Sequence, residues 1–538
     1  MGTTDDASGP QPPLQLHPHR KPRRSLQRIA ALLVLALPTA FLLFGGQWLA
    51  AAGLGPADTD TRIVTGTADL SKMEAEKAET LAREAAAAER RAAAAVKVPE
   101  YVPPAAFPIV PGQTVVSLTF DDGFSGQARA AEIMSAAGMD GTFYLNSGLI
   151  DEKGSVTLRQ AKNMALAGHE IAGHTFSHPD IATLDVSEAE REICQDRANL
   201  LSLGFQVTNF AYPFASGSTV ASLVEGCGYN SARGLGGTLD ETTCIGCPPV
   251  ESLAPAEPFL LKAPSQVERD WTLQDLQDAV TAADGTGGWV MLTFHGMCPY
   301  QCEWIDIDEA LFKEFVAWLE NRTKTTNTVV RSVQDVIGGP KAEPVTAPQP
   351  AVVARGENGI KNADLEQWSG DVPVCWAQAD YGTNKAEFGR ATGNQKSTGS
   401  TITVTKHRDG DAKIIPKRDL GTCAPQVAAG HRYSLRLWYS SDTRTQFSVH
   451  YRDSSGAWHF WVASPFLDPS SELVAAEWTT PPVPDGATAL SFGLALTSDG
   501  TVVTDDYGLY DVEGAPPAPG PSRLPTPAAL PGHEDGIE

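Results

Sequence analysis

Residues 115–123 read VVSLTFDDG, a run of apolar and β-branched residues that ends in two adjacent acids and a glycine. The run predicts a buried strand, because β-branched and aromatic residues favour strands. One acid before a glycine is an ordinary turn signal, and Asp-Asp-Gly alone commonly makes turns. Two acids where a strand opens into a loop can instead hold a metal ion and a proton acceptor close together. Asp121 and Asp122 are therefore candidate functional residues.

Apolar, strand-like runs alternate with helical patterns throughout residues 113–338. The strand-like runs include GTFYLN, HEIAGHT, VTNFAYP and WVMLTFH, and the helical patterns include SEAEREICQDRANLLSLG and DEALFKEFVAWLENR. This alternation predicts a parallel sheet with covering helices, which closes into a barrel in one common arrangement. In such folds the chemistry lies at the carboxyl ends of the strands. The polar motifs LTFDDG, HTFSH, FAYPF and LTFH all follow strand-like runs, so we expect them to converge on one face.

Three of the 11 histidines lie in the segment GHEIAGHTFSH. His174 and His178 are four residues apart and, with a carboxylate, would suit zinc or another divalent transition metal. Taken alone, this spacing is more often a pair of ordinary loop histidines. His169 is expected inside the strand as a hydrogen-bonded structural residue, and a structural role is also the simpler interpretation of His295 alone.

The ordered motifs TFDDG, HTFSH, FAYPF and LTFH resemble the motif series of the polysaccharide deacetylases. This is carbohydrate esterase family 4, the NodB-homology domain, whose members remove N- or O-acetyl groups from sugars. The resemblance covers about residues 115–336 and implies a distorted (β/α) barrel. It also implies roles for individual residues. The implied metal ligands, for zinc or another divalent cation, are Asp122, His174 and His178.

The resemblance implies that Asp121 is the general base and that His295 is the general acid. The backbone N–H of Phe214 would stabilise the oxyanion. The family's third motif often begins Phe-Arg, but here Ala211 stands where the arginine that orients the base is expected. Arg233 could replace it from a neighbouring strand end, or could be a surface arginine. The residues assigned to substrate binding are Tyr212, Phe214, Leu292 and Arg233.

The N-terminal segments predict export. Residues 1–28 form a basic tail, expected to be cytoplasmic, and residues 29–54 contain no charged residue. A helix of that length would span ~39 Å, enough to cross a bilayer. We therefore expect a single-pass transmembrane signal-anchor with the catalytic domain outside the cell. A secreted protein released by signal cleavage near Ala50 is the alternative. Residues 55–112 are expected to be an exposed helical stalk and a Pro-rich linker.

The eight cysteines also fit an exported protein, where disulfides persist. Cys375 is expected to pair with Cys423, and Cys194 with Cys227. The motifs 244–247 (CxxC) and 298–302 (CxxxC) are ambiguous. They favour disulfides over a structural zinc site in an oxidising compartment.

The C-terminal part changes character after a Pro/Ala linker at residues 339–354. Residues 355–514 show short strand-like runs between Gly, Asp, Ser and Pro turns, which predicts an all-β sandwich. Its ends resemble galactose-binding-like jelly rolls, the fold of several carbohydrate-binding modules. That resemblance makes Glu366 and Asp506 candidate ligands of a structural calcium, with two solvated turn acids as the alternative. Residues 515–538 are expected to be a disordered tail.

The overall expectation is a multidomain, metal-dependent deacetylase of an N-acetylated glycan, with peptidoglycan favoured over a chitin-like polymer because of the predicted tether. A net charge of −24 argues against nucleic-acid binding. Two alternatives stay open. One is an O-acetyl esterase of the xylan type, and the other is a non-catalytic glycan-binding surface protein on a decayed enzyme fold.

Overall fold

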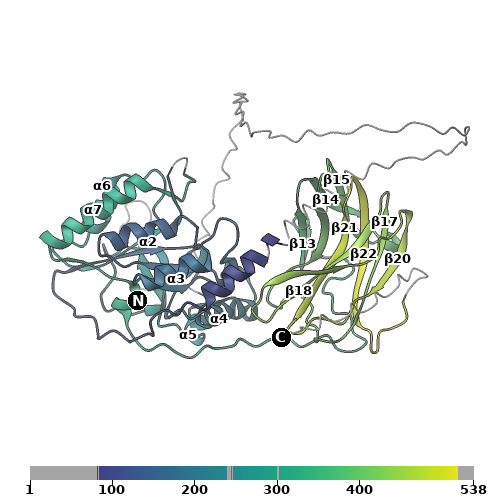
Figure 1. The fold of residues 1–538 in the computed structure, drawn as a ribbon, viewed down its shortest axis with the longest axis horizontal. Coiled ribbons are helices and arrows are strands. Elements are labelled where there is room, and N and C mark those ends of the chain that lie inside the picture. The colour runs from purple at the N-terminus through teal and green to yellow at the C-terminus, as the bar shows by residue number, and fades with distance from the viewer. Residues whose placement is uncertain are drawn as a thin grey trace, which may run out of the picture. The chain divides into compact units, whose positions relative to one another are not determined.

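A computed structural model of the protein describes residues 81–518, apart from 83, 218, 239–243, 245 and 300–301 (Figure 1). No helix in these ranges is both long enough and apolar enough to cross a bilayer. The predicted basic tail (1–28) and signal-anchor (29–54) lie outside the described residues, as do most of the stalk and most of the C-terminal tail.

A parallel sheet of eight strands forms the framework of residues 114–330. Its strands are β1 (Thr114–Phe120), β2 (Thr142–Leu145), β3 (Glu170–Gly173), β4 (Asn209–Ala211), β5 (Ser231–Gly237), β6 (Leu261–Ala263), β7 (Gly288–Phe294) and β10 (Thr328–Val330). The strand β1 pairs with β7 along its whole length, and with β10 and β2 at its two ends. The sheet then continues through β3, β4 and β5 to β6. The predicted parallel α/β architecture is therefore confirmed.

The described ladders do not close the sheet into a full ring, because none joins β6 to β7. A backbone hydrogen bond of 2.8 Å from Val267 to Thr293 links the chain after β6 to β7. All seven residues of β1 are buried, which explains why its sequence is an uninterrupted apolar and β-branched run. The arrangement is a half-barrel. The hydrogen bond between the chain after β6 and β7 is not part of a strand ladder.

Helices connect the strands in the alternation that the sequence predicted. They are α2 (Gln127–Ala136), α3 (Leu158–Leu166), α4 (Val186–Ser202), α5 (Ala221–Gly226), α6 (Leu273–Thr281), α7 (Glu309–Thr325) and α8 (Val333–Ile337). Side chains cap the first turns of several: Thr157 and Thr272 form capping boxes, and Asp185 accepts from the backbone N–H of Glu188. Such caps satisfy backbone donors that have no partner inside the helix.

The segment before the sheet is helical at residues 84–94, as expected for the stalk, and most of it is exposed. Its last turn is not a free stalk, however. Ala93 is only 1% exposed and belongs to the same hydrophobic core as β1. Arg90 pairs with Asp151, and Glu89 pairs with Arg159 at 3.0 Å. The expectation of a wholly exposed helix is therefore wrong for this turn, which docks on the α/β part of the chain.

Two five-stranded antiparallel sheets make up the C-terminal part (Figure 1). One runs β13 (Trp376–Tyr381), β16 (Asp411–Pro416), β21 (Ala489–Leu496), β18 (Thr445–Arg452) and β19 (Trp458–Ala463). The other runs β14 (Lys385–Thr392), β15 (Thr398–Thr405), β22 (Gly500–Asp511), β17 (Tyr433–Ser441) and β20 (Ser470–Thr479). Both sheets contribute to one hydrophobic core that includes Trp376, Phe447 and Trp478. The predicted antiparallel β-sandwich is confirmed.

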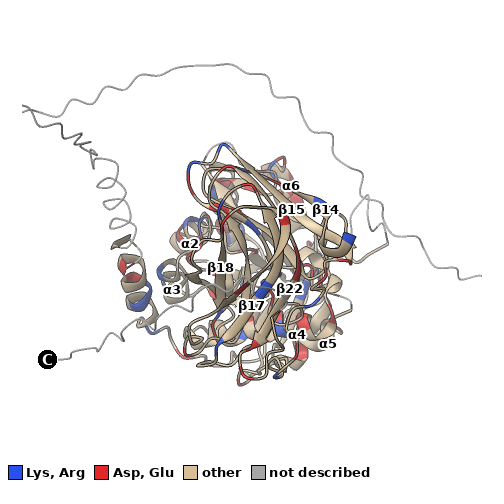
Figure 2. Cartoon of the chain, turned by 90° about the vertical axis from the view of Figure 1, so that its right-hand side faces the viewer, with Lys and Arg blue, Asp and Glu red and all other residues tan. Residues whose placement is uncertain are grey.

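All eight cysteines form disulfides. The expected pairs Cys194–Cys227 and Cys375–Cys423 are present. The two ambiguous motifs each close on themselves, as Cys244–Cys247 and Cys298–Cys302. The zinc alternative for these motifs is therefore wrong. In the described part of the chain, Asp and Glu are interspersed with Lys and Arg along helices and strands (Figure 2).

Candidate active site

Four parallel strands position the candidate catalytic side chains. The strand β1 leads directly into Asp121 and Asp122, β3 into His174, β4 into Tyr212 and β7 into His295. Because parallel strands share the orientation of their carboxyl ends, these side chains gather at one edge of the sheet. Five non-glycine residues here have left-handed backbones: Asp122, Thr175, His178, Phe214 and Ala215. Such conformations are disfavoured and concentrate at functional sites.

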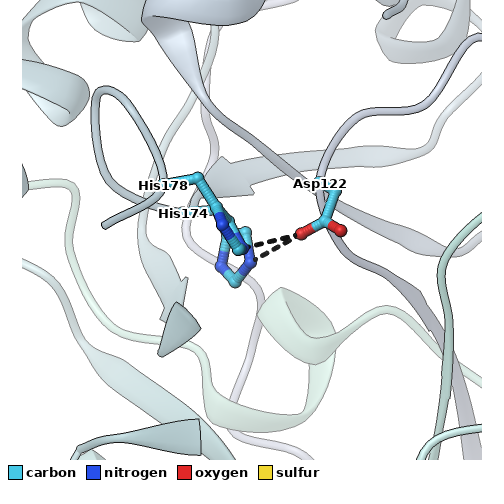
Figure 3. Close-up of side chains that lie close together, drawn as sticks. All are labelled: Asp122, His174 and His178. Atoms are coloured by element: carbon cyan, nitrogen blue, oxygen red, sulfur yellow. Dashed lines mark ion pairs between the residues drawn. The ribbon is translucent and has the colours of Figure 1, made fainter. Parts of the chain in front are cut away.

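Asp122, His174 and His178 converge on one point (Figure 3). Asp122 Oδ1 lies 3.2 Å from His174 Nε2 and 2.9 Å from His178 Nε2. The three ligand atoms lie within 4.8 Å of one another. Among the described residues, this is the one group of three or more His, Cys, Asp or Glu side chains close enough to share a cation.

The donor set fits a metal ion for a specific reason. His174 Nδ1 lies 2.8 Å from the carbonyl oxygen of Ala211, to which it can only donate. A neutral His174 therefore presents a lone pair at Nε2, toward Asp122. Asp122 Oδ1 is buried and has no hydrogen-bond partner among the described atoms. Two lone pairs facing each other in a buried site are stable when a cation lies between them.

The charges of this group are strongly coupled. Burial alone would raise the pKa of Asp122, but the nearby imidazoles of His174 and His178 outweigh it and lower that pKa. Burial alone would lower the pKa of His178, but Asp122 outweighs it and raises that pKa. Each partner thus favours the charged form of the other, so the site prefers a net positive charge beside the carboxylate.

Arg233 lies behind Asp121 and pairs with it. Arg233 Nη2 donates to Asp121 Oδ1, and the two side chains are only 1% and 5% exposed. Burial would raise the pKa of Asp121, but Arg233 and, less strongly, His174 and His295 outweigh it and lower that pKa. Asp121 is therefore held as a carboxylate, the form that a general base requires.

Arg233 supplies the guanidinium that the third motif lacks at Ala211. The two residues are register partners on the adjacent strands β4 and β5. The guanidinium reaches Asp121 from one strand further along the sheet, and it also lies over the ring of Tyr144, 5.1 Å from its centroid. Arg233 does not line the pocket, and it contacts the candidate base. Substrate binding by Arg233 stays a prediction.

His295 faces the same pocket, and its main chain is tied to that of Asp121. Gln127, a fully buried residue at the start of α2, donates from its amide to the carbonyl oxygens of Asp121 and His295. His295 Nδ1 is buried without a hydrogen-bond partner among the described atoms. Burial lowers the pKa of His295, although the two aspartates oppose that effect. The sequence analysis did not find Gln127, because a lone glutamine in a helix carries no motif.

Buried polar side chains support the loop between His174 and His178. Asp196 on α4 accepts the backbone N–H of His174 at 3.0 Å, and Glu192 accepts that of Ser177 at 2.9 Å. Asn146 donates to the carbonyl oxygen of Thr175 at 3.1 Å. The sequence analysis missed these residues too. A signal was present, since α4 carries acids at four-residue intervals, at positions 188, 192 and 196, on a face that the structure buries.

A pocket of about 150 Å³ surrounds these groups. Its lining residues are Asp121, Asp122, His174, His178, Tyr212, Phe214, Ala215, Leu235, Gln266, His295, Trp304 and Ile305. Tyr212 and Phe214 therefore lie where substrate binding was expected. Leu292 does not: it is fully buried in the core of the α/β domain. The substrate contact expected of Leu292 therefore stays a prediction.

The two predicted calcium ligands lie in the sandwich near the turn Asn394–Lys396. Glu366 accepts the backbone N–H of Thr398 at 2.6 Å, and Asp506 accepts from the side-chain amide of Asn394 at 2.8 Å. The buried Asp505 accepts the backbone N–H of Asn394 at 2.8 Å. Both predicted ligands thus accept hydrogen bonds from the protein itself. The calcium site stays a prediction.

Comparisons with known proteins agree with this geometry. Residues 110–232 match the family model of the polysaccharide deacetylases. A chitin deacetylase from Pestalotiopsis sp is 34% identical over 130 residues. The aligned region is 23% of this chain and 42% of that protein, so the chain spans less than half of the curated relative's length.

Two solved structures are among those similar to part of the chain. A structure described as a T48 deacetylase with substrate has 19% identity and a TM-score of 0.27, with 42% of this chain and 90% of that one covered. A family 11 carbohydrate-binding module of a Clostridium thermocellum cellulase has 13% identity and a TM-score of 0.20, with 30% and 97% covered.

Proposed function

From the match of residues 110–232 to the polysaccharide deacetylases, we propose that this chain is a metal-dependent hydrolase that removes N-acetyl groups from a polysaccharide and releases acetate. One observation carries the proposal. The cation-binding group of Asp122, His174 and His178 shares a single pocket with an arginine-paired carboxylate and a histidine. Amide hydrolysis needs a base and an acid on either side of an activated water.

The metal ligands would be Asp122, His174 and His178, and zinc is the cation that two imidazoles and a carboxylate suit best. When bound, it would supply Lewis-acid activation of water and of the acetyl carbonyl. The tautomer of His174 is already fixed for this role by the carbonyl oxygen of Ala211. All three ligands line the pocket that substrate would enter.

Asp121 accepts one proton from the attacking water. Its pairing with Arg233 keeps the carboxylate ionised and holds its orientation. His295 donates one proton to the sugar nitrogen as the C–N bond breaks, so that the amine leaves neutral. The backbone N–H of Phe214, in the left-handed turn after β4, would donate to the acetyl oxygen as negative charge develops there.

The favoured substrate is an N-acetylated envelope glycan such as peptidoglycan. This preference depends on the predicted tether at residues 29–54, which would place the enzyme beside the cell's own wall. A chitin-like polymer is the next candidate, since the curated relative is called a chitin deacetylase. Expulsion of an amine requires a proton donor more strictly than expulsion of an alcohol does, and His295 in the pocket favours the N-acetyl over the O-acetyl reaction.

The test is an acetate-release assay on peptidoglycan, acetylated chitin oligomers and acetylxylan, with and without a chelator. Release from the N-acetyl substrates that stops on chelation and returns with zinc would support the proposal. Asp121→Asn should abolish release while the protein still binds zinc. Release from acetylxylan alone would establish the O-acetyl esterase. Binding of glycans without acetate release from any substrate would favour the non-catalytic alternative.

For the sandwich we retain the proposal of a structural calcium near the turn Asn394–Lys396. It is supported by three carboxylates around this turn, those of Glu366, Asp505 and Asp506. Calcium prefers such oxygen ligands. Calcium should raise the melting temperature of the full chain, and Glu366→Ala should remove that increase. A melting temperature that calcium leaves unchanged would refute the site.

A further inference from the structure

Trp304 is a large side chain at the pocket that stays exposed to solvent. The residue is 58% exposed, yet it lines the same pocket as the metal-binding group and His295. Phe214 also lines the pocket and is 66% exposed, with its ring centroid 5.0 Å from that of His178. Exposed aromatic side chains beside a pocket of polar groups typically mark a binding surface.

The exposure of Trp304 does not come from a loose loop. The backbone N–H of Arg269 donates to the carbonyl oxygen of Trp304 at 3.0 Å, and the guanidinium of Arg269 donates to that of Cys302 at 3.0 Å. The disulfide Cys298–Cys302 closes the segment just before Trp304. The backbone is thus fixed from both sides while the ring has no packing that buries it.

Strand pairing fixes the base of the same segment. The short strands β8 (Met297–Cys298) and β9 (Ile307–Asp308) pair in parallel around it. The carboxylate of Asp306 accepts the backbone N–H of Glu303 at 3.0 Å. A backbone held in this way loses little conformational entropy when a ligand covers the side chain that it carries. This is the property of a pre-organised binding residue.

The size of the pocket shows where a glycan must extend. About 150 Å³ is half of the roughly 300 Å³ at the lower end of the range for ligand pockets. It suits an acetyl group and part of one sugar, so the neighbouring sugars of a chain must lie at the rim. A β-linked pyranose presents a face of C–H groups about the size of an indole, and covering that apolar face on a tryptophan removes both surfaces from water.

We propose that Trp304 is a specificity-determining residue that stacks on a pyranose ring next to the acetylated sugar. The enzyme then prefers an acetylated residue inside a glycan chain to a single acetylated sugar. This inference depends on the proposed deacetylase function, and it adds to it the residue that would bind the neighbouring sugar. The contact is made outside the reacting centre, so it affects binding of the chain and leaves the chemical step unchanged.

The test compares the full-length protein with Trp304→Ala, Trp304→Phe and the control Leu166→Ala. Leu166 is 49% exposed at the end of α3 and does not line the pocket. Acetate release is measured on N-acetylglucosamine itself and on its oligomers from the dimer to the hexamer. For Trp304→Ala we expect kcat/KM to fall about 10-fold on the hexamer through KM, with kcat and activity on the monosaccharide nearly unchanged. Trp304→Phe should recover most of the loss.

An equal loss on the monosaccharide and on the hexamer, or a loss in kcat alone, would overturn the inference. A second measurement separates it from the proposed function. Asp121→Asn protein, with and without Trp304→Ala, is titrated calorimetrically with the hexamer. Equal affinity of the two proteins overturns the inference, whatever the acetate assay shows. Binding that depends on Trp304, without acetate release by the unmutated protein from any substrate, refutes the deacetylase function and leaves the stacking residue in place.

Discussion

The guanidinium of Arg233 donates to the carboxylate of Asp121 beneath the pocket, and both side chains are almost completely buried. The arginine comes from β5, at the residue that pairs in register with Ala211 on β4. The sequence therefore lacks the arginine expected in its third motif but keeps a positive charge against the same acid. The geometry of parallel strands explains how this is possible, because adjacent strand ends are only one strand spacing apart.

Arg233→Ala should lower kcat on the order of 100-fold, the usual size of a general-base contribution. The pH profile should change as well. Arg233 lowers the pKa of Asp121 against the opposing effect of burial. Without Arg233 that pKa rises, so Asp121 becomes protonated at a higher pH and the acid limb of kcat/KM moves toward neutral pH. The profile is measured by acetate release from pH 4 to pH 8.

The matched control is Arg129→Ala, an exposed arginine on α2 that pairs with Glu132 and Glu309. It should leave both kcat and the acid limb unchanged. Arg233→Lys should recover part of the activity, because it retains the charge but not the fork geometry of the guanidinium. Since loss of Arg233 leaves a buried carboxylate unpaired, folding of each variant is checked by its melting temperature. An acid limb that stays in place in folded Arg233→Ala protein would contradict the role.

Zinc should bind at a single site in the deacetylase domain. We expect Asp122→Asn and His178→Ala each to weaken zinc binding at least 100-fold. Loss of a group that only supports a ligand typically lowers metal affinity 10- to 100-fold, and loss of a direct ligand should cost more. Isothermal titration of metal-free protein with zinc measures this directly. The control is Glu314→Gln, an exposed acid on α7. Zinc affinity that survives the loss of His178 would show that the three side chains do not share one ion.

Asp196 should tune that affinity without touching the metal. It is fully buried and accepts the backbone N–H groups of His174 and Ser147. Asp196→Asn keeps one acceptor oxygen but places N–H groups where a second acceptor is needed, so it should disturb the loop that carries His174. We expect zinc affinity to fall about 10-fold, as measured by the same titration. An unchanged affinity in folded protein would confine Asp196 to a purely structural role.

The sequence predicted the framework of the site well, because strand ends carry the signal. A buried run such as 115–120 fixes both the strand and the place of the acids that follow it. The sequence predicted the pairing of Arg233 with Asp121 only as one of two alternatives. The register between two strands cannot be predicted from the residues of one strand alone. The motif also did not indicate that Leu292 is fully buried. Residues alternate between the faces of a strand, and the motif does not say which face is filled by the core.

Supporting residues could not be predicted in the same way. Gln127, Asn146 and Trp304 act from single positions, and their roles depend on which backbone groups the fold brings to them. Every residue has a main-chain carbonyl, so a hydrogen bond to one leaves no signature in the amino-acid sequence at the accepting residue. Only the acids of α4 had a pattern, and an acidic stripe on a helix is ordinarily interpreted as a solvated face.

Glu170 provides a test of stability that is independent of the metal site. It is fully buried at the start of β3, and burial raises its pKa from 4.5 to about 7 against the hydrogen bonds of Asn209, Gln334 and Thr142. The folded protein therefore binds a proton here that the unfolded chain releases above pH 4.5. The stabilisation is fully present below that pH and is lost as the pH rises through 7. A rise from 4.5 to about 7 corresponds to ~3 kcal/mol.

Glu170→Gln removes the titration while keeping an acceptor oxygen for the neighbouring donors. The free energy of unfolding of the unmutated protein, minus that of Glu170→Gln, should therefore fall by ~3 kcal/mol between pH 4.5 and pH 8. Denaturant titrations at several pH values measure it, and metal-dependent effects cancel in the difference because both proteins keep the same ligands. The exposed Glu314→Gln should give a flat difference. A difference for Glu170→Gln that is also flat, or that rises with pH, would mean that Glu170 is ionised in the folded protein throughout, with its three donors outweighing burial.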